Sequence, residues 1–334
     1  MITGDHKETA LAVAKATGIA AHDAEAMTGT ELDALPDDDL REVVKSCNVY
    51  ARVLPSHKSR IVAALKANGE VVAMTGDGIN DAPALSAADI GCSMGISGTD
   101  VAKSASDMIL TDDNFATIVY AVREGRAIYD NIKKSVKFLL SSNIGEILTV
   151  MFGIIFGCAP PLTAIELLWV NLVTDSLPAI ALGLDPAADD IMERKPLDVK
   201  KGIFSGGLWF SIAFEGMMIG ALALVAYELG LVLTQNDTTA RTMAFFVLSV
   251  SQLVHAFNMR SEGSVLRGLF KNKYLLLSLI LGAAAQLAVI SIPAAAAIFN
   301  VCPLSGPLTA ICFALSVMPL VLVELQKLVI RRRS

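Results

Sequence analysis

Long apolar segments dominate the last two thirds of the chain, whereas the first 120 residues alternate short apolar and polar stretches. A hydrophobic segment of about 20 residues is long enough to cross a bilayer as a helix. The pattern therefore predicts six membrane-spanning helices, the first continuing a long helix that starts near Arg123. They comprise a run ending near Cys158, a second ending near Leu184, and segments at about 206–233, 239–259, 274–299 and 306–330.

The first third of the chain has the pattern of an α/β fold. Short strand-like runs alternate with helix-like runs, which favours a parallel sheet with right-handed crossovers. The acidic stretch Asp33–Asp39 is predicted to be a solvated, turn-rich surface. The predicted strands are 48–53, 71–74, 89–94 and 107–110, and the predicted helices are 6–17, 55–68 and one that opens at 97–99.

Composition narrows the class of protein further. The 334 residues are 54% hydrophobic with a mean hydropathy of +0.56, which is too apolar for an ordinary soluble domain. We expect two units, a soluble one at residues 1–120 and a membrane one at residues 121–334. The net charge of −6 argues against a nucleic-acid partner. The five cysteines have no zinc-like spacing and the four histidines are scattered, so a Cys or His metal cluster is not expected.

The sharpest motif of the soluble part is the loop Thr75–Leu85, which follows the apolar run 71–74. Ligands in open α/β sheets bind beyond the carboxyl ends of strands, where this loop would lie. Two acids and an amide, Asp77, Asp81 and Asn80, have the oxygen donors that suit Mg²⁺ beside phosphate and water. The alternative is a capped strand–turn–helix with solvated acids, which an isolated Asp-Gly pair would favour.

A second constellation lies inside the apolar segments. Asn143 and Glu146 are three residues apart, and Asn171, Thr174 and Asp175 are three and four apart, so each set shares one helix face. Charged groups inside a bilayer usually face a partner, a cavity or an ion path. Two carboxylates, two amides and a hydroxyl form an all-oxygen set that suits Ca²⁺. Polar side chains that merely join helices are the alternative.

These motifs together resemble those of the P-type cation-transporting ATPases, specifically the sarcoplasmic-reticulum-like calcium pump branch. The resemblance spans nearly the whole chain and weakens after about residue 200. The matching stretches are MITGD at 1–5, ARVLPSHKSRIV at 51–62, MTGDGINDAPAL at 74–85, DDNFATIV at 112–119, EGRAIYDNIK at 124–133, SSNIGEI at 141–147 and LLWVNLVTDSLPAIALGLDP at 167–186.

For the soluble part, the resemblance implies the second half of a phosphorylation domain with a haloacid-dehalogenase-like α/β fold, acting with Mg²⁺ and ATP. Asp77 would be the Mg²⁺ carboxylate, with Asn80 and Asp81 supporting the metal and the phosphoryl group. Lys58 would pair with phosphate oxygens; taken alone it would be an ordinary surface lysine. The loop that would bind phosphoryl and nucleotide phosphates consists of Thr3, Gly4 and Asp5.

For the membrane part, the resemblance implies that the five polar residues described above bind the transported Ca²⁺ on the fifth and sixth pump helices. Gln252 falls where the family's eighth helix often carries a glutamate, and it would supply an oxygen without charge. Pro178 removes a backbone hydrogen bond just beyond the site, which predicts a broken helix with exposed carbonyls. Glu228 is expected near a membrane interface, and Glu215 has no role that the pattern explains.

Basic residues predict the orientation of the membrane part. Cytoplasmic loops carry an excess of Lys and Arg, and here such residues lie after the second span, after the fourth and in the tail. The N-terminal domain and the C-terminus are therefore expected to be cytoplasmic. The residues are Arg194, Lys195, Lys200, Lys201, Arg260, Arg267, Lys271, Lys273, Arg331, Arg332 and Arg333.

The sequence also lacks several features of the family. The phosphorylated aspartate of these pumps lies in an Asp-Lys-Thr-Gly-Thr motif, which this sequence lacks. A nucleotide-binding domain, an actuator domain and four further membrane helices have no counterpart either. We expect the C-terminal portion of a calcium pump, from a truncated, split or mis-assembled product, which would not hydrolyse ATP alone. Its expected partners are membrane lipid, calcium and the missing N-terminal half. A pump for Mn²⁺, Na⁺ or H⁺, or a non-catalytic split membrane subunit, is the alternative.

Overall fold

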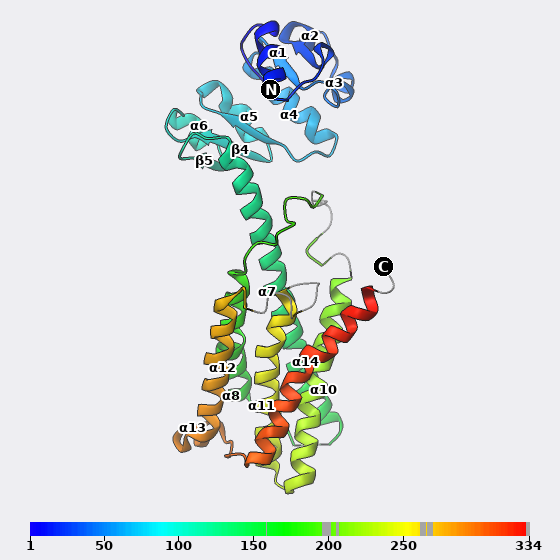
Figure 1. Ribbon diagram of the computed structural model, residues 1–334, viewed down its shortest axis with the longest axis vertical. Helices are drawn as coiled ribbons and strands as arrows, with labels where there is room; N and C mark the ends of the chain where they lie inside the picture. The colour runs from blue at the N-terminus through cyan, green and yellow to red at the C-terminus, as the bar shows by residue number, and fades with distance from the viewer. Residues whose placement is uncertain (158, 196–201, 205–206, 261–264, 266–269, 332–334) are drawn as a thin grey trace. The chain divides into compact units, whose positions relative to one another are not determined.

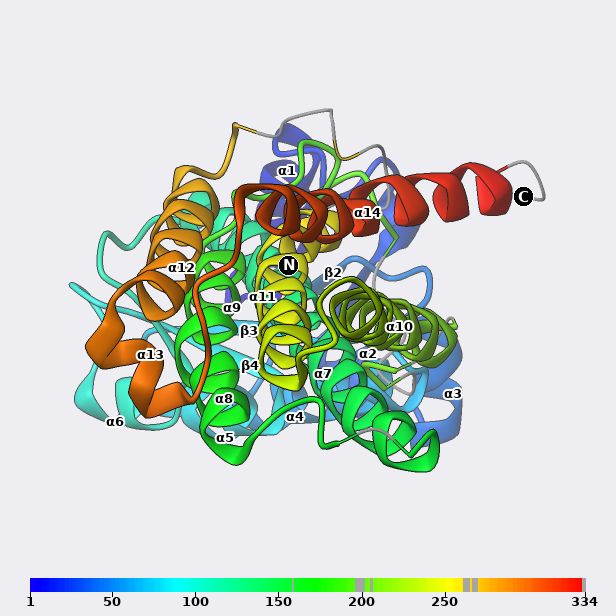
Figure 2. The same ribbon diagram turned by 90° about the horizontal axis from the view of Figure 1, so that it is seen from below.

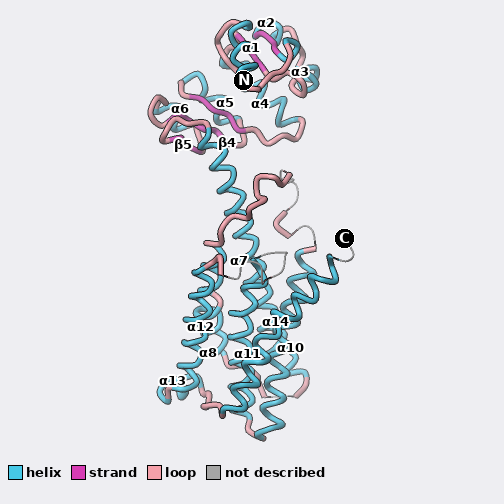
Figure 3. The backbone as a smooth tube through the Cα atoms, in the orientation of Figure 1, coloured by secondary structure: helices cyan, strands magenta, loops and turns pink. Residues whose placement is uncertain are grey.

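The computed structural model describes the chain except for residues 158, 196–201, 205–206, 261–264, 266–269 and 332–334. The chain divides into two compact units, Met1–Val122 and Arg123–Ser334, which are described separately. Within the described residues, strands occur only in the first unit, as the magenta segments of Figure 3 show. An α/β unit followed by an all-α unit confirms the predicted fold class.

Parallel strands form two small sheets in the N-terminal unit, not the one sheet expected. The first sheet has two strands and the second has three, in the order β3-β4-β5. Ile2 adds an isolated parallel bridge to Tyr50 of the first sheet. The strands are β1 (Ala26–Thr28), β2 (Val49–Ala51), β3 (Ala73–Gly76), β4 (Ile90–Met94) and β5 (Met108–Leu110).

The helices of this unit follow local sequence signals. Pro55 occupies the first turn of α4, where a missing N–H costs nothing, and Gly69 ends that helix with φ +86°. The Thr99 hydroxyl caps α6 by accepting a hydrogen bond from the Ala102 N–H. The helices are α1 (Lys7–Ala16), α2 (Gly29–Asp33), α3 (Asp37–Val43), α4 (Pro55–Ala67), α5 (Ala82–Ala87) and α6 (Asp100–Ser104), with 3₁₀ turns at Asp23–Glu25 and Ile79–Asp81.

Two segments differ from the sequence expectation. The strand predicted at 71–74 begins only at Ala73, and Val71 is 57% exposed because β3 is the edge strand of its sheet. The acidic stretch 33–39 is not all turn, since its last three aspartates form the first turn of α3. Negative charge is favourable at a helix N-terminus, and Arg60 adds a hydrogen bond to Asp37 at 2.7 Å.

Six helices in the described part of the second unit are long and apolar enough to cross a membrane, which confirms the six predicted spans. The longest, α7, has 40 residues and is about 60 Å long, twice the thickness of a bilayer core. The elements are α7 (Ala116–Ile155), α8 (Ala164–Trp169), a π-helical turn (Val170–Thr174), α9 (Ser176–Gly183), α10 (Leu208–Thr234), α11 (Asp237–His255), a 3₁₀ turn (Ala256–Arg260), α12 (Lys273–Ser291), α13 (Pro293–Phe299) and α14 (Gly306–Arg331).

Helix α11 lies at the centre of the bundle. Viewed along the bundle in Figure 2, it is surrounded by the other membrane helices, and the most apolar 18-residue window of its span is buried throughout. Its apolar side chains form one cluster with residues of α10, α12 and α14. Polar groups on α11 are therefore shielded from lipid by the neighbouring helices.

Glycines allow α7 and α10 to approach closely. A Cβ atom at Gly216 would lie 2.7 Å from the Ile144 Cγ2 atom and 2.8 Å from the Ser141 carbonyl oxygen. A Cβ at Gly220 would lie 2.9 Å from the Gly145 carbonyl oxygen. These distances are shorter than ordinary van der Waals contact, so only glycine fits at this crossing.

Two of the predicted spans are interrupted. The second span consists of α8, the π-helical turn and α9, with the widened turn just before Asp175. The predicted segment 274–299 divides at Ile292, where Pro293 begins the short helix α13. Proline at the first position of a helix is tolerated, whereas it would break a continuous one.

Candidate functional site

The loop after β3 is built around Asp81. The Asp81 carboxylate accepts a hydrogen bond from Lys58 Nζ and further bonds from the backbone N–H groups of Asp77 and Gly78, both at 3.2 Å. Burial acts to raise the pKa of Asp81, but the Lys58 and backbone hydrogen bonds outweigh it, so the pKa lies below its ordinary value. Asp81 is therefore held as an anion that shapes the loop.

Glycine is required at position 76 of this loop. A Cβ atom there would lie 2.4 Å from the Asp81 Cβ atom, so any side chain would displace the aspartate. The loop is also tied to the start of α6, because the Thr99 N–H donates to the Asp77 carbonyl oxygen at 2.8 Å. These contacts fix the backbone on both sides of Asp77.

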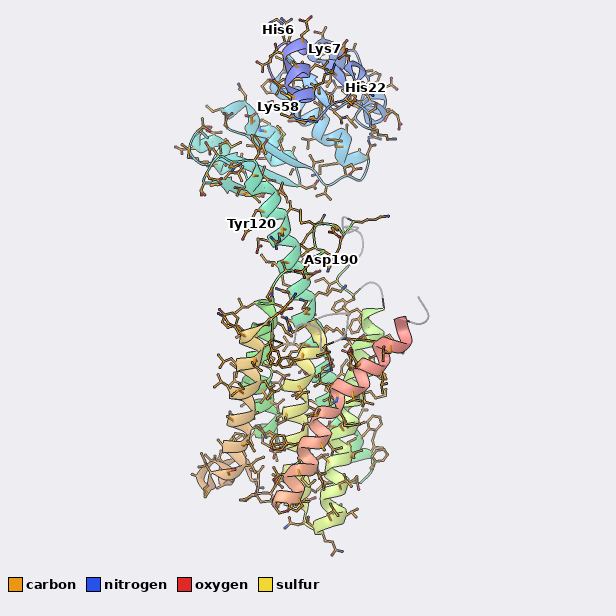
Figure 4. All side chains as sticks on the ribbon, viewed as in Figure 1. His6, Lys7, His22, Lys58, Tyr120 and Asp190 are labelled. Atoms are coloured by element: carbon orange, nitrogen blue, oxygen red, sulfur yellow. The ribbon has the colours of Figure 1, made fainter. Side chains whose placement is uncertain are left out.

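Asp77 and Asn80 expose their side chains, unlike the buried Asp81. An exposed carboxylate beside a fixed anion has the donor chemistry of a Mg²⁺ site, since Mg²⁺ prefers one or two carboxylates with water and phosphate. Lys58, labelled in Figure 4, lies in the first turn of α4 and brings a positive charge to the same loop. Of the four predicted catalytic residues, the geometry joins the side chains of Lys58 and Asp81, ties Asp77 to them through its backbone N–H, and leaves the side chains of Asp77 and Asn80 at the surface.

The predicted phosphate loop Thr3–Asp5 follows the parallel bridge between Ile2 and Tyr50. The Thr3 hydroxyl donates to the Asp5 carboxylate at 3.0 Å, and the Thr3 N–H donates to the Tyr50 carbonyl oxygen at 2.9 Å. Gly4 is exposed, and a Cβ atom at this position would meet no neighbouring atom within 4 Å. Because α4 follows β2, this loop and the start of α4 both lie beyond the carboxyl ends of neighbouring parallel segments.

In the membrane unit, Glu146 connects three helices. Its carboxylate accepts a hydrogen bond from Asn171 Nδ2 at 2.7 Å and another from Gln252 Nε2 at 3.2 Å. The side chain is 5% exposed. Residues from α7, the π-helical turn and α11, far apart in sequence, therefore meet at one carboxylate.

Asp175 lies beside Glu146 without a hydrogen-bond partner. The side chain is fully buried, and neither carboxylate oxygen reaches a donor in the described part of the chain. The Glu146 carboxylate and the Ser142 hydroxyl are its polar neighbours. The Gln252 Oε1 atom is likewise buried and unpartnered. Buried carboxyl and amide oxygens without hydrogen-bond partners are unfavourable, so a cation bound to them would be stabilising.

The π-helical turn redirects backbone oxygens at this point. The Asp175 N–H donates to the Val170 carbonyl oxygen five residues back at 2.9 Å, and the Ser176 hydroxyl donates to the Asn171 carbonyl oxygen at 3.1 Å. Thr174, which is fully buried, donates its hydroxyl to the Val170 carbonyl oxygen. Pro178 has no N–H for the carbonyl four residues earlier. Single π turns inside helices often occur at functional sites.

Asn143 and Thr174 are the predicted ion ligands that no contact of the described residues joins to the others, since the Thr174 hydroxyl bonds to Val170 of its own helix. The Asn143 amide nitrogen donates to the Leu139 carbonyl oxygen at 2.7 Å, one turn back on α7. Ser142 occupies the neighbouring position beside Asp175, and the sequence reasoning missed it. Its spacing of four residues from Glu146 is the signal that could have identified it.

Carboxylates are sparse around this site. Across the described ranges, no three His, Cys, Asp or Glu side chains are placed to share a metal ion. A cation held here would depend on two acids together with amide, hydroxyl and backbone oxygens, which suits a hard ion.

Two further buried acids were not explained by sequence. Asp185, at the end of the second span, accepts hydrogen bonds from Lys134, Arg260 and Asn272 at 2.7, 2.8 and 3.0 Å. It therefore ties α7, the 3₁₀ turn after α11 and the start of α12 together. Glu215 on α10 accepts a hydrogen bond from Lys137 of α7 at 2.7 Å. A lysine within an apolar helix is the signal that a buried partner exists.

Two family models match the chain. The model described as "Cation transporting ATPase, C-terminus" matches residues 159–329, and the model described as "haloacid dehalogenase-like hydrolase" matches residues 1–89. The first covers the last five of the six membrane spans and the second covers the loops around Thr3, Lys58 and Asp81.

Curated relatives match along almost the whole chain. "Calcium-transporting ATPase 1" of Bacillus cereus is 51% identical over 98% of this chain, and "Calcium-transporting ATPase" of Bacillus subtilis is 47% identical over 90%. The "Endoplasmic reticulum calcium ATPase srcA" of Aspergillus fumigatus is 37% identical over 99%. The matched part is 39%, 34% and 38% of these proteins, so the chain spans less than two fifths of their length.

Proposed function

This chain belongs to the P-type cation-transporting ATPases, and we propose that it forms the C-terminal portion of an ATP-driven calcium pump. In this proposal residues 1–120 are the second half of the phosphorylation domain, and residues 121–334 are the stalk and pump helices five to ten. The aspartate that is phosphorylated is contributed by a part of the pump outside these 334 residues.

The observation that carries the proposal is the buried, unpartnered Asp175 carboxylate beside Glu146. A site that only joined helices would have its acids satisfied by donors, as Asp185 is by Lys134 and Arg260. At Asp175, by contrast, the carboxyl oxygens are buried without donors. Calcium accepts six to eight oxygen ligands, and carboxylates, amide oxygens and carbonyls are its usual set. The three relatives named above are calcium ATPases, which favours calcium over other hard cations.

We assign the ion ligands accordingly. Glu146 and Asp175 supply the charge, and Gln252 supplies a neutral oxygen from α11. Asn143 enters the site only if its amide turns away from Leu139. The neutral members of the proposed set are Asn143, Asn171, Thr174 and Gln252.

In the N-terminal unit, the exposed Asp77 carboxylate is the proposed Mg²⁺ ligand, and Asn80 and Asp81 are proposed to support the metal and the phosphoryl group. Bound Mg²⁺ neutralises charge on the phosphoryl oxygens during transfer from ATP. Lys58 adds positive charge on the same side while holding Asp81 in place. The loop of Thr3, Gly4 and Asp5 offers a hydroxyl and an unobstructed backbone to phosphate.

The proposed orientation places the N-terminal unit and the C-terminus in the cytoplasm. The first residues of α10 and α12 and the last turn of α14 lie at one end of the bundle in Figure 1. Arg194, Lys195, Lys271 and Lys273 belong to that end, as the positive-inside rule requires. Arg260 ends the 3₁₀ turn after α11 and Arg331 ends α14, whereas the basic residues at 200, 201, 267, 332 and 333 lie outside the described residues.

Equilibrium ⁴⁵Ca²⁺ binding to the membrane-inserted protein tests the proposal. Asp175→Asn removes half of the site's charge at nearly constant volume, and we expect at least a tenfold loss of calcium affinity. Asp189→Asn makes the same chemical change at an exposed position and should bind calcium like the wild type. Equal binding by both variants would mean that the buried carboxylates only join helices.

A further inference from the structure

A second group of buried ionisable side chains lies one turn along α11 from Gln252. The Glu215 Oε1 atom accepts hydrogen bonds from Lys137 Nζ at 2.7 Å and from the Ser211 hydroxyl at 2.8 Å. The other oxygen, Oε2, lies 3.5 Å from the His255 Nε2 atom. Glu215 and His255 are buried at 2% and 0% side-chain exposure. Neither Glu215 Oε2 nor His255 Nε2 makes a hydrogen bond in the described part of the chain.

The surroundings define the protonation of the histidine ring. The Asn258 Nδ2 atom lies 3.1 Å from His255 Nδ1 and 3.0 Å from the Pro319 carbonyl oxygen, which can only accept. The amide is therefore the donor, Nδ1 is the acceptor, and the neutral ring carries its hydrogen on Nε2, facing Glu215. Because Lys137 already balances Glu215, the group is electrically neutral in this state.

The same surroundings can accept one more proton. A doubly protonated ring needs an acceptor at each nitrogen. Glu215 Oε2 faces Nε2, and Asn258 Oδ1 is buried without a partner and reaches Nδ1 by a turn of the amide. That turn withdraws Nδ2 from Pro319 on α14. One acceptor of a charged imidazolium, Glu215 Oε2, therefore already faces the ring, and the second, Asn258 Oδ1, is supplied by the turn of the amide.

This group lies on helices that also carry the proposed cation site, but none of its side chains is a proposed cation ligand. His255 is three residues from Gln252, which is about 4.5 Å of rise along α11. Gly216, next to Glu215, packs against Ser141 and Ile144 of the α7 turn that precedes Glu146. The charged groups nearest in sequence to the contacts around His255 are Lys137 on α7, Glu215 on α10, Arg260 on the 3₁₀ turn, and Glu324 and Lys327 on α14. The Lys327 Nζ donates to the Asn258 carbonyl oxygen at 3.0 Å.

We propose that His255 and Glu215 form a proton-binding site, separate from the cation ligands, whose proton is released when a cation binds beside Glu146. The inference rests on the proposed function for its cation. The proton comes from hydronium of the aqueous phase and adds to His255 Nδ1, so imidazole becomes imidazolium and a water molecule is left. No other covalent bond changes, while the Asn258 amide exchanges its hydrogen bonds to Nδ1 and Pro319 for one from the protonated Nδ1 to Oδ1. Histidine is the side chain that titrates near neutral pH. A divalent ion one turn away raises the local positive potential and disfavours the imidazolium.

The test is a ¹⁵N-histidine NMR titration of the protein in phosphatidylcholine nanodiscs, without and with saturating CaCl₂. His255→Asn identifies the signal among the four histidines. We expect a doubly protonated ring at pH 6 in calcium-free buffer and at least a threefold loss of that species when calcium is added. Glu215→Gln should reduce the protonated fraction at pH 6, because it removes the acceptor that carries negative charge. His22→Asn, at an exposed histidine labelled in Figure 4, should change neither result.

The outcomes separate this inference from the proposed function. A ring that stays neutral from pH 5.5 to 8 overturns the proton site. A ring that titrates identically with and without calcium, in protein that binds ⁴⁵Ca²⁺, overturns the linkage while the cation site stands. Protein that binds no calcium but protonates His255 in a Glu215-dependent way supports the proton site and refutes the calcium assignment.

Discussion

Replacing Gly216 by alanine should separate α7 from α10. The added methyl group would lie 2.7 Å from the Ile144 Cγ2 atom and 2.8 Å from the Ser141 carbonyl oxygen, about 1 Å inside ordinary contact distance. The carbonyl belongs to the helix backbone and cannot rotate away, so the two helices must move apart. Overpacking of this kind costs about 1–3 kcal/mol.

The melting temperature of the detergent-solubilised protein measures this effect. For a unit of about 200 residues, 1 kcal/mol corresponds to roughly 2–4 °C, so Gly216→Ala should lower Tm by at least a few degrees. Because Glu215 adjoins the substituted residue, its pairing with Lys137 should weaken as well.

Gly125→Ala is the matched control. It lies within α7, and nothing approaches within 4 Å of its Cβ position. The same substitution there should raise stability by about 0.5–1 kcal/mol, since alanine favours a helix over glycine. If Gly216→Ala melts at or above the wild-type temperature while Gly125→Ala behaves as expected, the close approach of α7 and α10 is not a stabilising contact.

Three further predictions concern the sites. In the complete pump, Asp77→Asn should abolish Mg²⁺-dependent phosphoenzyme formation without impairing membrane insertion; normal phosphoenzyme levels would exclude Asp77 as the metal ligand. Gln252→Glu should tighten ⁴⁵Ca²⁺ binding at neutral pH, because ligand charge governs calcium affinity, and an unchanged affinity would place α11 outside the ion site. Because the pKa of Asp81 lies below its ordinary value of 3.8, its ion pair stabilises the N-terminal unit above about pH 4 and that contribution is lost as the pH falls through the lowered pKa. In Asp81→Asn, the urea concentration at the unfolding midpoint of this unit should depend less on pH in that acid range. An unaltered pH dependence would contradict the assignment.

Sequence periodicity identified the membrane helices and most of the polar residues that meet between them. A spacing of three or four residues places side chains on one face, which is why Glu146 and Asn171 were both found. Periodicity says nothing about which side chains bond across helices. The packing of α11 against α7 decides that Gln252 reaches Glu146, which is 106 residues away. It also decides that the Asn143 amide bonds to its own helix.

In the N-terminal unit, too, the sequence pattern does not determine which residues the fold buries. The apolar run at 71–74 predicted a buried strand, yet burial depends on how many neighbours the strand has in its sheet. With only β4 beside it, β3 leaves Val71 exposed and pairs further along, at Ala73–Gly76. The loop residues Lys58, Asp77 and Asp81 were found because their order along the chain is distinctive, whereas the Lys58–Asp81 bond required the fold.

Helix α11 constrains how the protein is made. Of the six membrane spans in the described chain it has the lowest hydropathy and the most complete burial, and it carries Gln252 and His255. A helix of this composition partitions into lipid less favourably than the other five, because its polar groups would meet hydrocarbon without a partner. We infer that α11 becomes stably integrated only when α12 and α14, synthesised later, cover the faces that α10 leaves open. Biogenesis of this bundle therefore finishes with its last helix, and a nascent chain that ends before α14 would present α11 to quality control.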